Sequence, residues 1–208
     1  MSRQFAFYRQ VSKSSAETIH AAVQDVLAGV SYLRPVPPDL LHMSLLNNNH
    51  VARDANTDDM VTDYETFQQR SKSLPESHHP SKQGVVHVYD ARAVKKVLAL
   101  HTSRPGWLCR EREWVQNVSG LQEGDLRFQN DHYTPHITLA RIIRERHEGE
   151  RYLSDYARQI AGAIACGTYI TLEPLDFESP ESAWTFRPDR TEVLGRSPAP
   201  RVAASIAS

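Results

Sequence analysis

Two short segments of the sequence place a histidine two residues before a hydroxyl side chain, within an otherwise apolar stretch. The segments are His42-Met43-Ser44-Leu45 and His136-Ile137-Thr138-Leu139. This alternation is typical of a β-strand, in which residues i and i+2 project to the same side with Cα atoms about 6.5 Å apart. An imidazole and a hydroxyl at that spacing can reach one phosphate group, since the imidazole moves a proton and the hydroxyl donates a hydrogen bond. The two segments therefore predict chemistry at a phosphate.

The bare pattern of histidine, any residue, then serine or threonine is weak by itself. Ten histidines should give about one or two such matches by chance. The sequence holds five, and the other three begin at His79, His101 and His132. A proline follows His79 directly and follows His132 closely, whereas His101 lies at the end of a predicted strand. Only the segments at His42 and His136 combine an apolar middle residue with a trailing leucine.

Two histidines that face one phosphodiester can cleave it without a metal. A neutral imidazole removes a proton from the nucleophile and a protonated one donates to the leaving oxygen, each transfer being worth about 100- to 10,000-fold in rate. Ser44 and Thr138 would stabilise the charge that grows on the phosphoryl oxygens. Either His42 or His136 fits either role. No His-Glu-x-x-His segment and no closely spaced cysteine pair indicates a metal site instead.

Strands and helices that position these segments can be read from the spacing of apolar residues and from turn residues. Strands are predicted over residues 4–11, 40–46, 84–89 and 94–101, within 131–141, and over 168–177 with a partner at 183–187. Helices are predicted over residues 58–70, 104–118 and 152–165, and from Ser14 or Ser15 to about residue 28, with Gly29 and Gly167 as stop signals. The mixed order predicts an α+β or α/β domain made of two similar halves.

Thr134 to Arg141 resembles the second signature of the two-histidine (2H) phosphoesterases, and residues 40–46 resemble the first. That superfamily includes the bacterial 2'-5' RNA ligase-like proteins and the cyclic nucleotide phosphodiesterases. The resemblance implies an α+β, bilobal fold in which two pseudo-symmetric lobes, each an antiparallel sheet with flanking helices, enclose a central cleft. It also implies His42 and His136 as catalytic residues, with no cofactor and no metal.

The implied activity is hydrolysis of 2',3'-cyclic phosphate or 2'-5'-linked nucleotide and RNA substrates, so the expected partner is a nucleotide or an RNA end. Binding or 2'-5' ligation of RNA ends in the same cleft, and hydrolysis of cyclic oligonucleotide signals, remain open alternatives. Two features depart from the family pattern. Ser44 stands where threonine is commoner, and Asn47-Asn48-Asn49 replace an apolar, often aromatic, continuation.

Composition sets the wider expectations. The 208 residues, 40% of them apolar, suit one bilobal domain over 1–196. The tail over 197–208, rich in alanine, serine and proline, is expected to be disordered. A net charge of -1 excludes the strongly basic class of bulk nucleic-acid binders. No signal-peptide run and no membrane-spanning stretch is present, so a cytoplasmic monomer is expected. Cys109 and Cys166 are expected to be reduced, partly buried thiols.

Several other residues could belong to the site. Strand alternation predicts that Arg141 faces away from His136 and Thr138. Packing is as plausible as contact with substrate for His132 and Tyr133, and core packing is favoured over base stacking for the aromatic pair at residues 7 and 8. The aspartates at positions 54, 58, 59 and 63 lack the ligand order of a calcium loop and are expected on a solvated face.

Overall fold

The computed structural model describes residues 6–47, 50–52, 55, 64–73, 82–94, 96–127, 132–142 and 149–175. The predicted strand at 183–187, the tail at 197–208 and the four aspartates between 54 and 63 lie outside the described residues. The described strands are β1 (Ala6–Gln10), β2 (Leu33–Pro35), β3 (His42–Asn47), β4 (Gly84–Val94), β5 (Val97–Thr102), β6 (His136–Ile142) and β7 (Tyr169–Leu172). The helices are α1 (Lys13–Val26), α2 (Tyr64–Lys72), α3 (Gly106–Val118) and α4 (Gly149–Ala163), with short 3-10 helices η1 (Pro38–Leu40) and η4 (Glu123–Asp125).

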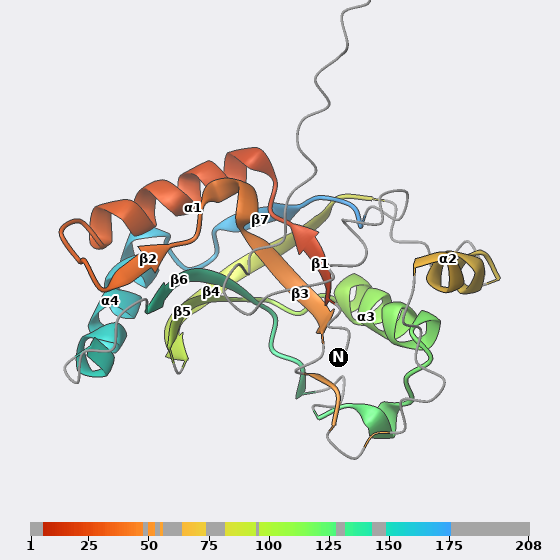
Figure 1. The fold of residues 1–208 in the computed structure, drawn as a ribbon. Coiled ribbons are helices and arrows are strands. Elements are labelled where there is room, and N and C mark those ends of the chain that lie inside the picture. Colours follow the sequence, from red (N-terminus) through yellow and green to blue (C-terminus); the bar gives the residue numbers. More distant parts are fainter. Residues whose placement is uncertain are drawn as a thin grey trace, which may run out of the picture.

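The strands form one curved antiparallel sheet in the order β1-β3-β6-β5-β4-β7, with β2 added beside β6 (Figure 1). In the first half the chain runs from β1 through α1 and β2 to β3, and β1 pairs with β3. β5, α3 and β6 repeat that arrangement, and β5 pairs with β6. β3 and β6 are neighbours, so the two halves meet along this strand pair. The predicted α+β class with two similar halves is confirmed.

Helix α1 illustrates how the sequence positions these strands. Its buried residues Ala16, Ile19 and Val23 recur at helical spacing and form its core-facing side. The helix begins after Ser12, two or three residues earlier than the predicted serine caps, and the Ser12 side chain makes no capping hydrogen bond. It ends before Gly29, which adopts the left-handed conformation with φ of 79° that glycine allows. α1 and α4 pack together and against the β4–β6 part of the sheet, and α3 packs on β3.

β2 and the end of α4 differ from the sequence-based expectation. β2 pairs with β6 at Leu33, Arg34 and Pro35, in a proline-containing stretch for which no strand was predicted. Pro35 is tolerated there because β2 adds to the side of the sheet path, where a missing N–H donor costs little. Helix α4 was predicted to end at residue 165, with Gly167 as its stop signal, but it ends at Ala163. Ala165, with φ of 47°, adopts the left-handed conformation two residues before Gly167 does.

A buried ion pair joins the first strand to α3. Arg9 and Glu111 are 2% and 4% exposed, and Nε of Arg9 donates to a carboxylate oxygen of Glu111 at 2.6 Å. Arg9 also donates to the carbonyl oxygens of Lys82 and Glu173 and lies 4.9 Å from the ring centre of Trp107. One arginine of the first half thereby anchors α3 of the second half, next to the strand that carries the His42 segment.

Candidate functional site

The four residues predicted for the site share one face of two neighbouring strands. β3 and β6 pair at Met43 and Ile137, whose side chains are both fully buried. The residues on either side of each are half-buried instead, so they project to the opposite face. We call this surface the histidine face; it is formed by His42, Ser44, His136 and Thr138.

Both histidines are held in the same way. Nδ1 of His42 lies 2.9 Å from the carbonyl oxygen of Leu40, and Nδ1 of His136 lies 3.1 Å from that of Thr134. A carbonyl only accepts, so each Nδ1 carries a proton and donates it. In the neutral ring, Nε2 is then the unprotonated nitrogen that can take a proton from a substrate. In each case the carbonyl belongs to the residue two positions earlier, so the same local arrangement occurs in both halves of the molecule.

Each motif strand also contains a β-bulge. The pairing of β1 with β3 shifts between Leu46 and Ser44, and that of β5 with β6 shifts between Ala140 and Thr138. Two consecutive residues are therefore buried in each strand, Leu45 with Leu46 and Leu139 with Ala140. The alternation of faces changes phase after each bulge.

The bulge in β6 overturns the prediction that Arg141 faces away from His136 and Thr138. Arg141 is exposed after two buried residues and returns to the histidine face. It pairs across the sheet with Arg34, which is also exposed, and like charges at opposed positions repel each other. Among the described residues the Arg141 side chain has no ion pair. Although the residue as a whole is exposed, partial burial of its guanidinium lowers the pKa of that group, which stays protonated at neutral pH. The two arginines form a cationic end of the histidine face.

A buried arginine that no sequence pattern singled out supports the first motif strand. Arg112 of α3 is 1% exposed, donates to the carbonyl oxygen of Leu45 and lies 3.4 Å from Nδ1 of His50. Its guanidinium lies 4.4 Å from the ring centre of Tyr133, and the Tyr133 hydroxyl donates to the Ser44 carbonyl oxygen at 2.6 Å. Tyr133 is therefore a packing residue that fixes the backbone beside the Ser44 hydroxyl.

Burial keeps the neighbours of Arg112 neutral. Burial, with the positive charge of Arg112 as the next cause, lowers the pKa of His50 to about 4. Burial also raises the pKa of the Tyr133 hydroxyl far above its ordinary value. His50 is thus an uncharged acceptor near pH 7, which suits its position beside a cation that only donates.

Tyr8 packs beside the first histidine. Phe7 is fully buried in the hydrophobic core, as predicted, whereas Tyr8 is 8% exposed and pairs across the sheet with Ser44 of the histidine face. The Tyr8 and His42 ring centres are 5.0 Å apart with a tilt of 54°. The contact limits how far the His42 imidazole can turn.

His101, which sequence context set aside, lies directly beside the second histidine. It pairs with His136 across β5 and β6, and the two rings stack with centres 6.0 Å apart. His101 is 8% exposed, and neither ring nitrogen has a hydrogen-bond partner among the described residues. Burial, followed by the proximity of His136, lowers its pKa. The His101 ring also contacts Tyr89 in an edge-on arrangement, with ring centres 6.0 Å apart.

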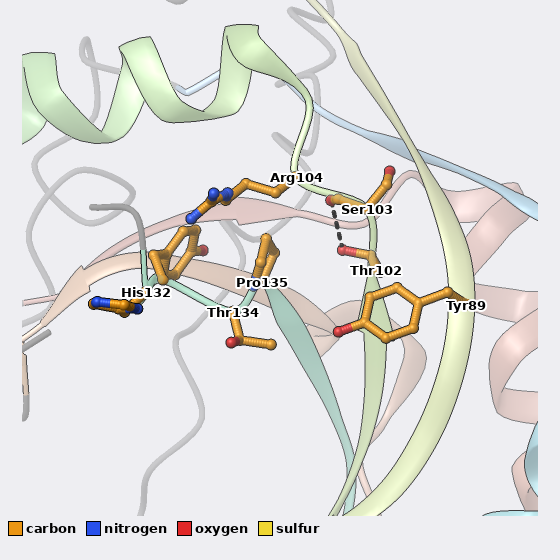
Figure 2. A pocket seen from close by; sticks show the side chains of 8 residues that line it. Tyr89, Thr102, Ser103, Arg104, His132, Thr134 and Pro135 are labelled. Atoms are coloured by element: carbon orange, nitrogen blue, oxygen red, sulfur yellow. Dashed lines mark hydrogen bonds between the residues drawn. The ribbon is translucent and has the colours of Figure 1, made fainter. Parts of the chain in front are cut away.

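A cavity of about 370 Å³ opens next to His136. Its walls are Tyr89 of β4, residues 102–104 at the end of β5, and residues 132–135 that lead into β6 (Figure 2). Thr134, whose carbonyl oxygen holds His136, is one of the lining residues. His132 is exposed at this cavity, so the site includes it as a lining residue.

Within the described ranges, no cluster of three or more histidine, cysteine or carboxylate side chains is arranged to hold a metal ion. No described helix combines the length and apolar character that crossing a membrane requires. Cys109 and Cys166 are free thiols as predicted, although Cys166 is exposed and only Cys109 is partly buried.

Known proteins resemble this chain in structure. No family model matches it, and no curated protein matches it either. TT0787 of Thermus thermophilus is 16% identical over 70% of this chain and 76% of its own, with a TM-score of 0.46. The conserved protein of unknown function ATU0111 of Agrobacterium tumefaciens is 17% identical over 78% and 76%, with a TM-score of 0.48. Escherichia coli LigT, in complex with phosphate, is 17% identical over 70% and 75%, with a TM-score of 0.44.

Proposed function

We propose that this protein is a metal-independent phosphodiesterase of the two-histidine (2H) type that hydrolyses 2',3'-cyclic phosphate or 2'-5'-linked nucleotide and RNA substrates. The observation that supports it most is the repeated hydrogen bond from Nδ1 of His42 and of His136 to the carbonyl two residues earlier. That bond leaves two equivalent Nε2 atoms for one substrate. A hydroxyl side chain, Ser44 or Thr138, accompanies each on the histidine face.

In this mechanism the phosphate lies between the two histidines. For a 2',3'-cyclic phosphate, Nε2 of one neutral imidazole takes a proton from water as the water oxygen bonds to phosphorus. The bond between phosphorus and one ribose oxygen breaks, and the other imidazolium gives its Nε2 proton to that oxygen. The product is a phosphomonoester, and the two rings have exchanged protonation states. Proton exchange with solvent water restores the starting protonation states of the two imidazoles before the next turnover.

The remaining polar groups of the histidine face act on the charge of the phosphate. The Ser44 and Thr138 hydroxyls donate hydrogen bonds to nonbridging oxygens, where negative charge increases in the transition state. The Arg141 guanidinium, which lacks an ion pair within the described chain, is suited to a bidentate contact with two phosphate oxygens.

The decisive experiment measures hydrolysis of adenosine 2',3'-cyclic phosphate and of a 2'-5'-linked dinucleotide in excess EDTA. We expect wild-type turnover with a bell-shaped pH profile and losses of about 100- to 10,000-fold in His42→Ala and in His136→Ala. His87→Ala, at an exposed histidine of β4, is the matched control and should keep full activity. Wild-type rates in either His42→Ala or His136→Ala would rule the proposal out. Products longer than the substrate would assign ligation, which is the reverse of 2'-5' cleavage, to the same residues.

A further inference from the structure

The cavity beside His136 has a composition that suits an anion. Every residue that lines it, apart from Pro135, carries a hydroxyl, imidazole or guanidinium group. No carboxylate is among the described residues that line it. Asp90, the residue after Tyr89 on β4, is paired with Arg92 at 2.5 Å, so its charge is locally neutralised. The described lining is therefore polar, and Arg104 is the cationic side chain among these residues.

Figure 2 shows how the cationic and hydroxyl groups are distributed around this cavity. The Arg104 side chain extends across one side toward the 132–135 segment, and Thr102 and Thr134 lie on the other. The Ser103 hydroxyl accepts a hydrogen bond from the His87 N–H at 2.9 Å, which leaves its own proton to donate. Arginine with several hydroxyl donors is the side-chain set that commonly binds phosphate.

A row of three aromatic rings leads from the histidine face to the cavity. His136, His101 and Tyr89 follow one another with ring centres 6.0 Å apart at each step. The buried His101 is the middle member and fixes the spacing of the other two, while Tyr89 is 44% exposed at the cavity. An exposed tyrosine ring is a surface on which a nucleobase can stack.

We propose that this cavity binds a second phosphate of the substrate, one nucleoside away from the phosphate that is cleaved, with Arg104 as its main ligand and Tyr89 beside the intervening nucleoside. The inference rests on the proposed function and narrows its substrate class to nucleotides that carry at least two phosphates. The volume of about 370 Å³ falls within the range of about 300–1,000 Å³ of small-molecule sites. Either the 5'-phosphate of a single nucleotide or the internal phosphodiester of an RNA end has this chemistry.

The test compares three substrates that share one base. These are adenosine 2',3'-cyclic phosphate, the same compound with a 5'-phosphate, and an adenosine dinucleotide that ends in a 2',3'-cyclic phosphate. We expect kcat/KM to be about 10- to 100-fold higher for the second and third substrates than for the first. A gain for the dinucleotide alone would identify an internal phosphodiester as the ligand, and a gain for both would identify the phosphoryl group itself.

Variants of the lining residues test whether the increase in kcat/KM comes from binding in the cavity. Arg104→Gln should remove the advantage of the second phosphate while it leaves hydrolysis of adenosine 2',3'-cyclic phosphate unchanged. Tyr89→Ala should lower kcat/KM for all three substrates through KM, and Tyr89→Phe should restore it. Arg110→Gln and Tyr152→Ala are matched controls, because both residues are exposed and neither lines the cavity. Equal wild-type kcat/KM for all substrates, or equal losses in Arg104→Gln, would refute the second phosphate site and leave the proposed function intact.

A binding measurement separates the two proposals if no substrate is turned over. Fluorescence anisotropy of a labelled adenosine trinucleotide gives its dissociation constant as a function of salt without any need for catalysis. Arg104→Gln should weaken binding about 10-fold or more and reduce the slope of log K against log salt by about 0.7, the value for one phosphate contact on a single strand. An unchanged slope would contradict the site independently of activity.

Discussion

Arg141 is the residue whose role the structure changes most. Its position after the β6 bulge puts a cation on the histidine face, with Arg34 beside it across the sheet. A guanidinium there adds a positive charge that, unlike the charge of an imidazolium, is retained throughout turnover.

We therefore expect Arg141→Gln to lower kcat/KM for a 2',3'-cyclic phosphate by about 10- to 100-fold, as the loss of a charged hydrogen bond implies. Arg141→Lys should recover part of it, because an ammonium keeps the charge and loses the bidentate geometry. Arg158→Gln is the control, since Arg158 pairs with Asp155 on the surface of α4. Steady-state kinetics with a check of thermal stability measures the effect, and an unchanged kcat/KM in Arg141→Gln would remove Arg141 from the site.

At the scale of elements, the position of α3 decides whether the first motif strand is correctly supported. α3 supplies Glu111 to the buried pair with Arg9, and it supplies Arg112 to the Leu45 carbonyl. Gly84 of β4 also belongs to this contact, because a Cβ there would come within 2.4 Å of the Trp107 ring of α3. The helix, β1, β3 and β4 are thus held as one packed unit.

Removal of one partner of the buried pair should be costly. Glu111→Ala leaves the Arg9 guanidinium buried and without its carboxylate, for which a loss of about 3–5 kcal/mol in the free energy of unfolding is expected. Glu113→Ala is the control on the same helix, because Glu113 is exposed, and it should change stability by about 0.5 kcal/mol or less. Urea unfolding followed by circular dichroism compares the two. Similar stabilities of the two variants would show that the pair does not hold α3 in place.

At the scale of the whole molecule, burial of neutral histidines links stability to pH. The pKa of His50 is lowered from 6.5 to about 4, so the unfolded chain binds a proton between these values that the folded protein does not. The free energy of unfolding should therefore fall as pH drops from about 6.5 to about 4, by up to about 3 kcal/mol from this group. The lowered pKa of His101 adds a dependence of the same sign.

Unfolding curves measured across this pH range test the linkage. His50→Gln should flatten the dependence of stability on pH below 6.5 relative to the wild type. His87→Gln, at an exposed histidine, should keep the wild-type slope. If His50→Gln also kept that slope, the acid sensitivity would have to come from other groups.

The sequence by itself determined the two histidine–hydroxyl segments and the strands that carry them. That was possible because the alternation around His42 and His136 is local, as is the spacing of Ala16, Ile19 and Val23 in α1. The α+β class followed from the order of such local patterns. The predicted catalytic roles depend on chemistry that neither local pattern nor fold tests.

Only the tertiary structure decided which further residues join these segments. The bulge that turns Arg141 toward His136 exists because β6 pairs with β5, a strand whose register cannot be read from β6 alone. The same register places His101 beside His136, and the packing of α3 on β3 buries Arg112 against the backbone of Leu45. Strand alternation fixes which residues can share a face, but pairing between distant segments fixes which ones meet.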